Sequence, residues 1–206
     1  MAKISGKIVV ASHNPGKLTE MRALLEPYGI ECITAGALGL PEPDETGTTF
    51  HENALIKAKA AAEGSGLPAI ADDSGLCVVA LDGRPGVYTA NWAERQTFEG
   101  PSGRDWYMAM GKVEGRLCAL GRDVDRSCWF NSTLAIAWPG GDSKIYDGRV
   151  EGSVIWPPRG DRGFGYDPVF VPNGGKLTFG EMDPAEKYKI DHRADAFAKL
   201  VADQFG

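Results

Sequence analysis

The chain has 206 residues, of which 43% are hydrophobic and 24% are charged, as is ordinary for a globular α/β protein. This length fits one large domain or two lobes sharing a cleft, and neither a disulfide nor a metal is needed for folding alone. The net charge is −6 without any basic run, which argues against a nucleic-acid-binding protein, because such proteins neutralise phosphates with clustered Lys and Arg.

The cysteines and the N-terminal residues indicate the cellular compartment in which we expect the protein. The four cysteines form no CxxC motif, so we expect reduced, mostly buried thiols. Residues 1–7 lack the apolar stretch of a signal peptide, and no later apolar run is long enough to span a membrane. We therefore expect a cytoplasmic protein that binds neither membranes nor nucleic acid.

A strand followed by a helix is predicted at the start of the chain. Residues 8–11 form a short apolar run, which predicts a buried strand. Apolar residues recur at helical spacing over residues 18–28, and Gly29 stands where a helix commonly ends. The motif SHNPGK (residues 12–17) thus lies at a helix N-terminus, where free N–H groups and Lys17 favour a phosphate. It lacks the spacing of a Walker A loop, so an ordinary turn stays an alternative.

A second predicted helix begins with a capping box formed by Thr49 and Glu52. Asn53 and Lys57 share one face of this helix because they are four residues apart. The loop before the helix carries Glu45, for which a solvated acid is the simpler interpretation and a functional role the alternative.

Two adjacent carboxylates follow the next predicted strand. Residues 68–71 form a short apolar run that we expect to stop at Asp72 and Asp73. Ligands of open α/β sheets bind beyond the carboxyl ends of strands, and Mg²⁺ prefers carboxylate oxygens together with water and phosphates. One acid would bind the metal while the other orients a water or anchors the loop. A turn capped by Asp and Ser74 is the structural alternative.

One helix and further strands are predicted in the second half. Residues 105–120 predict a helix broken or bent near its two glycines. Residues 127–138 and 144–150 predict a hairpin, and residues 154–156 a further strand.

Two segments near the end of the chain carry further candidate residues. Residues 164–168 (FGYDP) offer aromatic rings that stack on a purine and a carboxylate that accepts base N–H groups, although an aromatic turn has the same composition. Lys187, His192 and Arg193 fall in a helical region where a solvated face is the default interpretation. Apolar positions of this region recur on one face: Ile190, Ala194, Phe197 and Val201.

In this order, the motifs resemble those of the inosine triphosphate pyrophosphatase family. They are SHNPGK, ETGTTFHENALIKA, ADDSGL, GRPG, GFGYDP and GEM with the following EK and HRA, and they extend over nearly the whole chain. The resemblance implies a single α/β domain over residues 1–206, with an elongated two-lobed fold around a central mixed β-sheet flanked by helices. It also implies an active site in the cleft between the lobes and a homodimer.

The resemblance implies roles for individual residues. Asp73 would be the catalytic base and, with Glu45, a ligand of Mg²⁺, while Asn53, Lys57 and Asp72 would support the metal and the phosphates. The residues expected to bind the substrate are Ser12, His13, Asn14, Pro15, Gly16, Lys17, Ser74, Phe164, Gly165, Tyr166, Asp167, Lys187, His192 and Arg193. Of these, residues 12–17 would hold the triphosphate, and those from Phe164 onward would hold the base.

The reaction implied is hydrolysis of non-standard purine nucleoside triphosphates (ITP, dITP, XTP) to the monophosphate and pyrophosphate, which keeps deaminated purines out of DNA and RNA. Two positions depart from the family pattern: Asp191 stands in place of Ser, and Asn91 in place of Arg. Two alternatives stay open. One is a Maf-type nucleotide pyrophosphatase acting on modified or pyrimidine triphosphates, and the other is a catalytically silent nucleotide sensor.

Overall fold

The computed structural model describes residues 3–12, 15–94 and 103–206. The strands are β1 (Lys7–Val10), β2 (Glu31–Thr34), β3 (Ala69–Val78), β4 (Ser127–Ala137), β5 (Ser143–Val154) and β6 (Phe170–Pro172). The helices are α1 (Pro15–Leu25), α2 (Phe50–Ser65), α3 (Trp106–Leu120), α4 (Pro184–Lys187) and α5 (His192–Gln204). None of the helices in these ranges is long and apolar enough to cross a bilayer.

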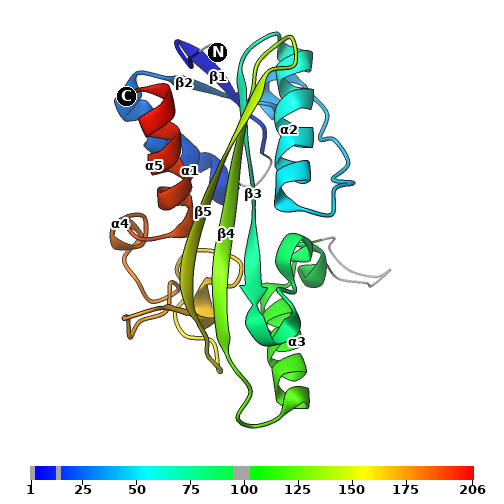
Figure 1. Ribbon diagram of the computed structural model, residues 1–206, viewed down its shortest axis with the longest axis vertical. Coiled ribbons are helices and arrows are strands. Elements are labelled where there is room, and N and C mark those ends of the chain that lie inside the picture. Colours follow the sequence, from blue (N-terminus) through cyan, green and yellow to red (C-terminus); the bar gives the residue numbers. More distant parts are fainter. Residues whose placement is uncertain (1–2, 13–14, 95–102) are drawn as a thin grey trace. The chain divides into compact units, whose positions relative to one another are not determined.

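The strands are hydrogen-bonded in the order β2-β1-β3-β4-β5-β6 (Figure 1). Strand β1 pairs in parallel with both β2 and β3, whereas β5 and β6 are antiparallel, so the sheet is mixed. The predicted α/β class, with a mixed sheet flanked by helices, is confirmed.

The chain divides into two compact units. Unit 1 comprises Met1–Asp73, Ser132–Gly148 and Arg193–Gly206, and unit 2 comprises Ser74–Asn131 and Arg149–His192. Each unit has its own hydrophobic core, and the residues of each are considered separately below.

In unit 1, helices cover the strands on both faces. Helices α1 and α5 lie on one face and α2 lies on the other (Figure 1). The face toward α1 and α5 carries the larger side chains Ile8, Val10, Ile70, Leu134 and Ile136. The face toward α2 carries the smaller side chains Val9, Ala69, Ala71, Ala135 and Ala137. Because side chains alternate along a strand, even-numbered positions at the start of β3 point toward α1 and α5, and odd-numbered positions point toward α2.

Strand β3 is longer than the sequence predicted. We expected it to stop at Asp72, but it continues without interruption to Val78, and all of its residues except Ser74 are buried. The prediction was wrong because Asp, Ser and Gly usually favour a turn, whereas here ion pairs to lysines of the neighbouring helices hold the two buried aspartates in the strand. Asp72 and Asp73 therefore lie within a strand and point to its opposite faces.

In unit 2, helix α3 is uninterrupted from Trp106 to Leu120, so the predicted break is wrong. Its buried residues Ala109, Met110, Val113 and Leu117 pack into the core of the unit. This packing outweighs the cost of about 1 kcal/mol for each helical glycine. The separate strand expected over residues 154–156 is also wrong, because β5 itself extends to Val154.

The C-terminal helical region consists of two helices. Ile190 lies between α4 and α5 and is exposed, so it does not belong to the expected apolar face. Helix α5 instead buries Ala196, Phe197 and Leu200.

The cysteines are free, as expected. Cys77 and Cys128 are buried, whereas Cys32 is half-buried and Cys118 is exposed. Burial raises the pKa of Cys77 to about 12, so this thiol is protonated at neutral pH.

Candidate active site

The predicted capping box fixes the start of α2. The hydroxyl of Thr49 accepts the N–H of Glu52 at 3.2 Å, and the carboxylate of Glu52 accepts the N–H groups of Thr48 and Thr49 at 2.7 and 3.0 Å. These hydrogen bonds lower the pKa of Glu52. The structure therefore assigns Glu52 to the cap, as the sequence suggested.

Asn53 supports the loop that carries Glu45. Its side chain is buried, and its Oδ1 accepts the N–H of Gly47 at 2.8 Å. A Cβ atom at Gly47 would lie only 2.5 Å from this oxygen, so the close approach requires glycine. Asn53 thus positions Glu45 through the backbone of the loop.

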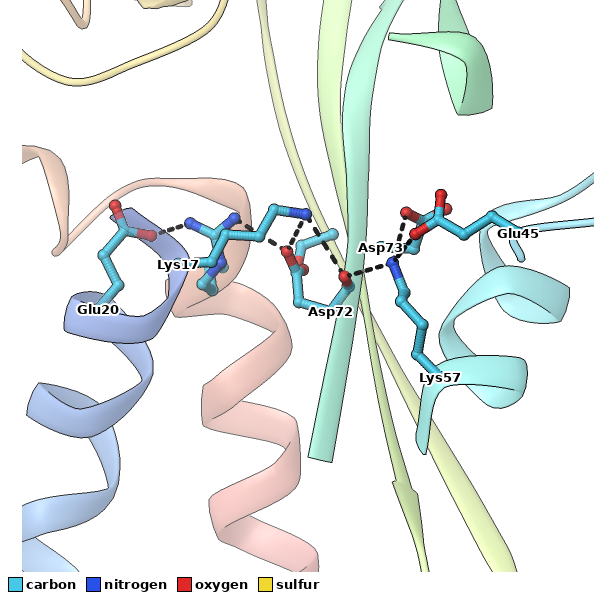
Figure 2. A network of polar contacts seen from close by, with 8 residues as sticks. Lys17, Glu20, Glu45, Lys57, Asp72 and Asp73 are labelled. Carbon is cyan, nitrogen blue, oxygen red and sulfur yellow. Dashed lines mark hydrogen bonds and ion pairs between the residues drawn. The ribbon is translucent and has the colours of Figure 1, made fainter. Parts of the chain in front are cut away.

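Glu45, Lys57 and Asp73 converge on the α2 face of β3 (Figure 2). Lys57 Nζ lies 2.6 Å from Glu45 Oε1, 3.1 Å from Asp73 Oδ1 and 3.1 Å from the backbone oxygen of Asp72. Burial lowers the pKa of Lys57, but the charges of Asp73 and Glu45 outweigh it and raise the pKa above its usual value. Lys57 is therefore a buried, charged ammonium group shared by two acids.

Asp73 has one carboxylate oxygen in this ion pair and one outside it. Its Oδ2 is buried and has no hydrogen-bond partner among the residues that the structure describes. Burial raises the pKa of Asp73, although Lys57 opposes the shift. A buried oxygen without a partner destabilises a fold, so it indicates a position where a bound ion or water supplies the contact.

Glu45 and Asp73 are a donor set that fits Mg²⁺. Both offer hard carboxylate oxygens, and one oxygen of each already faces the same cation, Lys57. Within the described ranges, no cluster of three or more His, Cys, Asp or Glu residues suits a metal ion. The remaining ligands would therefore be water and substrate phosphates, which is the usual arrangement for Mg²⁺ at phosphate-binding sites.

Asp72 points to the opposite face of β3, toward α1 and α5. Its Oδ2 lies 2.7 Å from Lys17 Nζ and 3.2 Å from Arg193 Nη2, and its Oδ1 accepts the hydroxyl of Ser132 at 2.7 Å. Burial alone would raise the pKa of Asp72, but Arg193 and Lys17 outweigh it and hold this pKa well below its usual range. Asp72 is therefore a permanently charged anchor rather than a proton acceptor.

Arg193 joins α1, β3 and α5 in one buried network. Its Nη1 pairs with Glu20 of α1, and both side chains are almost wholly buried, with exposures of 2% and 5%. Glu20 and Ser132 were not among the residues predicted from the sequence. A signal for Glu20 was available, because it follows Lys17 by three positions and thus shares its helix face.

In unit 2, the predicted residues Asp167 and Lys187 form a buried ion pair. Lys187 Nζ lies 2.7 Å from Asp167 Oδ2, which also accepts the N–H of Phe164 at 3.0 Å. The ammonium group lies 5.3 Å from the centre of the Phe164 ring, within the range of a cation–π interaction. Burial raises the pKa of Asp167, although Lys187 opposes the shift. Lys187 thus holds both Asp167 and the aromatic side chain in place.

Aromatic contacts fix two further predicted residues of unit 2. His192 stacks on Phe130 with ring centres 4.9 Å apart, and Tyr166 packs edge-on against Trp106 at 5.7 Å. Tyr166 is part of the core, whereas Phe164 is half-buried.

The remaining predicted residues have different places. Ser74 and Gly165 of unit 2 are half-buried, as is Ser12 of unit 1. His13 and Asn14 lie outside the described residues, and Pro15 and Gly16 form the start of α1. The expected role of Arg193 at the base stays a prediction, since its described contacts join it to Asp72 and Glu20 in unit 1.

The two departures from the family pattern lie in unit 2. Asp191 is buried, whereas Asn91 donates a hydrogen bond to Glu94 at 3.3 Å at the surface.

Comparisons with known proteins agree with the motifs. The sequence model of the Ham1 family matches residues 8–203. The chain is 57% identical to a dITP/XTP pyrophosphatase of Caulobacter vibrioides, over 98% of this chain and 100% of that protein. It is 54% identical to a dITP/XTP pyrophosphatase of Brucella melitensis, over 97% and 93% of the two chains.

Solved structures show the same relationship. A HAM1 protein from Coxiella burnetii matches with a TM-score of 0.85 and 38% identity, over 96% of this chain and 98% of that chain. A nucleoside-triphosphatase (dITP/XTP pyrophosphatase) from Mycobacterium abscessus matches with a TM-score of 0.73 and 40% identity, over 95% and 98%. The family resemblance is confirmed by these matches, and the chain belongs to the Ham1 family.

Proposed function

We propose that this chain hydrolyses non-standard purine nucleoside triphosphates, such as ITP, dITP and XTP, to the monophosphate and pyrophosphate, with Mg²⁺ as cofactor. The observation that carries the proposal is the pair of carboxylates of Glu45 and Asp73, which face one cation while Asp73 keeps a buried oxygen without a partner among the described residues. The relatives that match over nearly the full chain are named dITP/XTP pyrophosphatases, which supports dITP and XTP as substrates.

The residues of unit 1 account for the chemistry at the phosphates. Mg²⁺ held by Glu45 and Asp73 would neutralise the charge of the triphosphate. Asp73 accepts the proton of a water that attacks the α-phosphorus, since its pKa is raised above that of an ordinary carboxylate. The bond from this phosphorus to the bridging oxygen breaks as pyrophosphate leaves. Lys17 and the N-terminus of α1 stabilise the leaving group.

The residues of unit 2 account for recognition of the base. Phe164 offers a ring for stacking, and Asp167 offers a carboxylate that accepts the N–H of a 6-keto purine. Adenine has no N–H at this position of its ring, so it would not donate the hydrogen bond that a 6-keto purine donates to this carboxylate. A site built on such hydrogen bonds rejects an unpaired analogue by about 10⁴-fold.

The proposed function predicts a strong preference among nucleotides. Pyrophosphate release with Mg²⁺ should give kcat/KM values for ITP, dITP and XTP about 10⁴-fold above that for ATP, with GTP as a second reference. EDTA should abolish the release. Equal rates on all purines would contradict the proposed base recognition, and preference for pyrimidine or modified nucleotides would indicate a Maf-type enzyme. Binding without any release would indicate a silent sensor.

The loop glycine provides a further test of the proposed site. In Gly47→Ala, the new Cβ atom clashes with Asn53 and displaces the loop that carries Glu45. We expect kcat/KM on ITP to fall by about tenfold to 100-fold, because a displacement of about 1 Å in a catalytic group has effects of this size. Gly36→Ala is the matched control, since a Cβ atom there meets nothing within 4 Å. Equal activity in the two variants would show that the loop does not position Glu45.

The assembly and the compartment also belong to the proposal. We propose that the protein acts as a cytoplasmic homodimer that binds neither membranes nor nucleic acid, as the family resemblance and the net charge of −6 suggest. Size-exclusion chromatography with light scattering tests the dimer.

A further inference from the structure

The ammonium group of Lys57 has all three of its donors directed at the proposed metal site: at the two carboxylates and at the backbone oxygen of the neighbouring Asp72. An ammonium group has three N–H donors, and the three acceptors within 3.1 Å are Glu45 Oε1, Asp73 Oδ1 and the backbone oxygen of Asp72. Lys57 is 7% exposed, so water does not screen these contacts effectively. The two carboxylates are thus held together by a cation that belongs to the chain itself.

The charges of this cluster oppose the binding of a divalent ion alone. Glu45, Asp73 and Lys57 together carry one negative charge, and a divalent ion at the same carboxylates would stand beside the ammonium group. Like charges at such short range repel each other strongly when both are buried. Lys57 must therefore find another anion before the two carboxylates are free to bind a metal tightly.

A triphosphate supplies this anion close to Lys57. Lys17 Nζ reaches the same backbone oxygen of Asp72 at 3.4 Å, and Figure 2 shows the two lysines approaching this oxygen from opposite sides of β3. The two ammonium groups are therefore near neighbours, and a phosphate that binds Lys17 also offers oxygens to Lys57.

We propose that Lys57 acts as an internal counter-ion that occupies the carboxylate pair in the nucleotide-free protein and turns to the phosphates when nucleotide binds. This inference rests on the proposed function of the same site. Lys57 thereby couples the binding of Mg²⁺ to the binding of nucleotide, because nucleotide draws away the ammonium group that competes with the metal. Such coupling is reciprocal, so Mg²⁺ also strengthens the binding of nucleotide. The protein binds Mg²⁺ weakly until a triphosphate is present.

Metal binding by the nucleotide-free protein tests the inference. Mg²⁺ is titrated calorimetrically into the wild type, Lys57→Met and Lys59→Met. Lys59 lies on the same helix and is exposed, so its replacement makes the same change in charge away from the carboxylates. We expect Lys57→Met to bind Mg²⁺ at least about tenfold more tightly than the wild type, within the usual range of coupling between sites, and Lys59→Met to be unchanged. Equal affinity in all three proteins, or weaker binding by Lys57→Met, overturns the inference.

Melting temperatures provide a second readout without activity. In EDTA, Lys57→Met should melt below Lys59→Met, because Glu45 and Asp73 then repel each other, and Mg²⁺ should restore more stability to it than to the control. If Lys57→Met does not fold in EDTA, Lys57→Gln is measured in the same way. Rescue of either variant by Mg²⁺ supports the inference, and failure of both to be rescued overturns it. Failure of the proposed function is distinguishable, because the wild type would then release no pyrophosphate from ITP.

Discussion

Replacement of Asp73 by asparagine is expected to lower kcat on ITP by at least about 100-fold, the usual contribution of a general base. Asparagine keeps the shape of the side chain and an oxygen that still accepts the hydrogen bond from Lys57. It removes the negative charge that would help to hold Mg²⁺ in the proposed site and the group proposed to take the proton from water. The loss should therefore appear in kcat and not only in KM.

The stability of this variant should separate a catalytic role from a structural one. Asp73 is buried and has an oxygen without a partner among the described residues, so an uncharged amide there need not destabilise the fold. We expect the free energy of unfolding to change by less than about 1 kcal/mol. Asp44→Asn is the control, because Asp44 is an exposed acid next to Glu45 and should keep normal turnover. Near-normal turnover in Asp73→Asn would remove Asp73 from the mechanism.

Replacement of Arg193 by methionine should have the largest effect on stability. Arg193 lies between Glu20 and Asp72, and the side chains of all three are at most 5% exposed. Removal of one partner from a buried ion pair destabilises a protein by about 3–5 kcal/mol, because the remaining charges stay buried. We expect a loss of this size in the free energy of unfolding, measured by urea denaturation of the purified variant.

A matched variant on the same helix shows whether burial of the ion pair causes the loss of stability in Arg193→Met. Lys199 of α5 forms an ion pair with Asp195 at 3.0 Å, but both side chains are largely exposed. Lys199→Met should therefore cost less than about 1 kcal/mol. Equal losses in the two variants would contradict the importance of the buried network. A raised KM for ITP without any loss of stability would instead indicate that Arg193 binds the purine base of the substrate.

Local signals in the sequence predicted several elements correctly. The capping box of Thr49 and Glu52 is present at the start of α2, and Gly29 ends a helical segment in a left-handed conformation. Such signals are reliable because the interacting groups are only a few positions apart, so their geometry depends little on the rest of the fold. The order of the motifs likewise identified the family, which the comparisons confirmed.

The same local reasoning failed at β3 and at α3. Aspartates predicted the end of a strand and glycines predicted a break in a helix, because the intrinsic preferences of these residues point that way. The structure has neither, since buried ion pairs hold Asp72 and Asp73 in the strand and core packing holds α3 together. Tertiary contacts outweighed local preferences of about 1 kcal/mol.

The sequence alone was enough to predict the family, the α/β class and most of the residues of the proposed site. Only the tertiary structure decided how these residues are divided: Asp73 faces Lys57 and Glu45 on one side of β3, while Asp72 faces Lys17 and Arg193 on the other. Lys17 and Arg193 are 55 and 121 positions away from Asp72 along the chain. Local periodicity carries no information over such separations, because it is the pairing of strands and the packing of helices that bring these charges together.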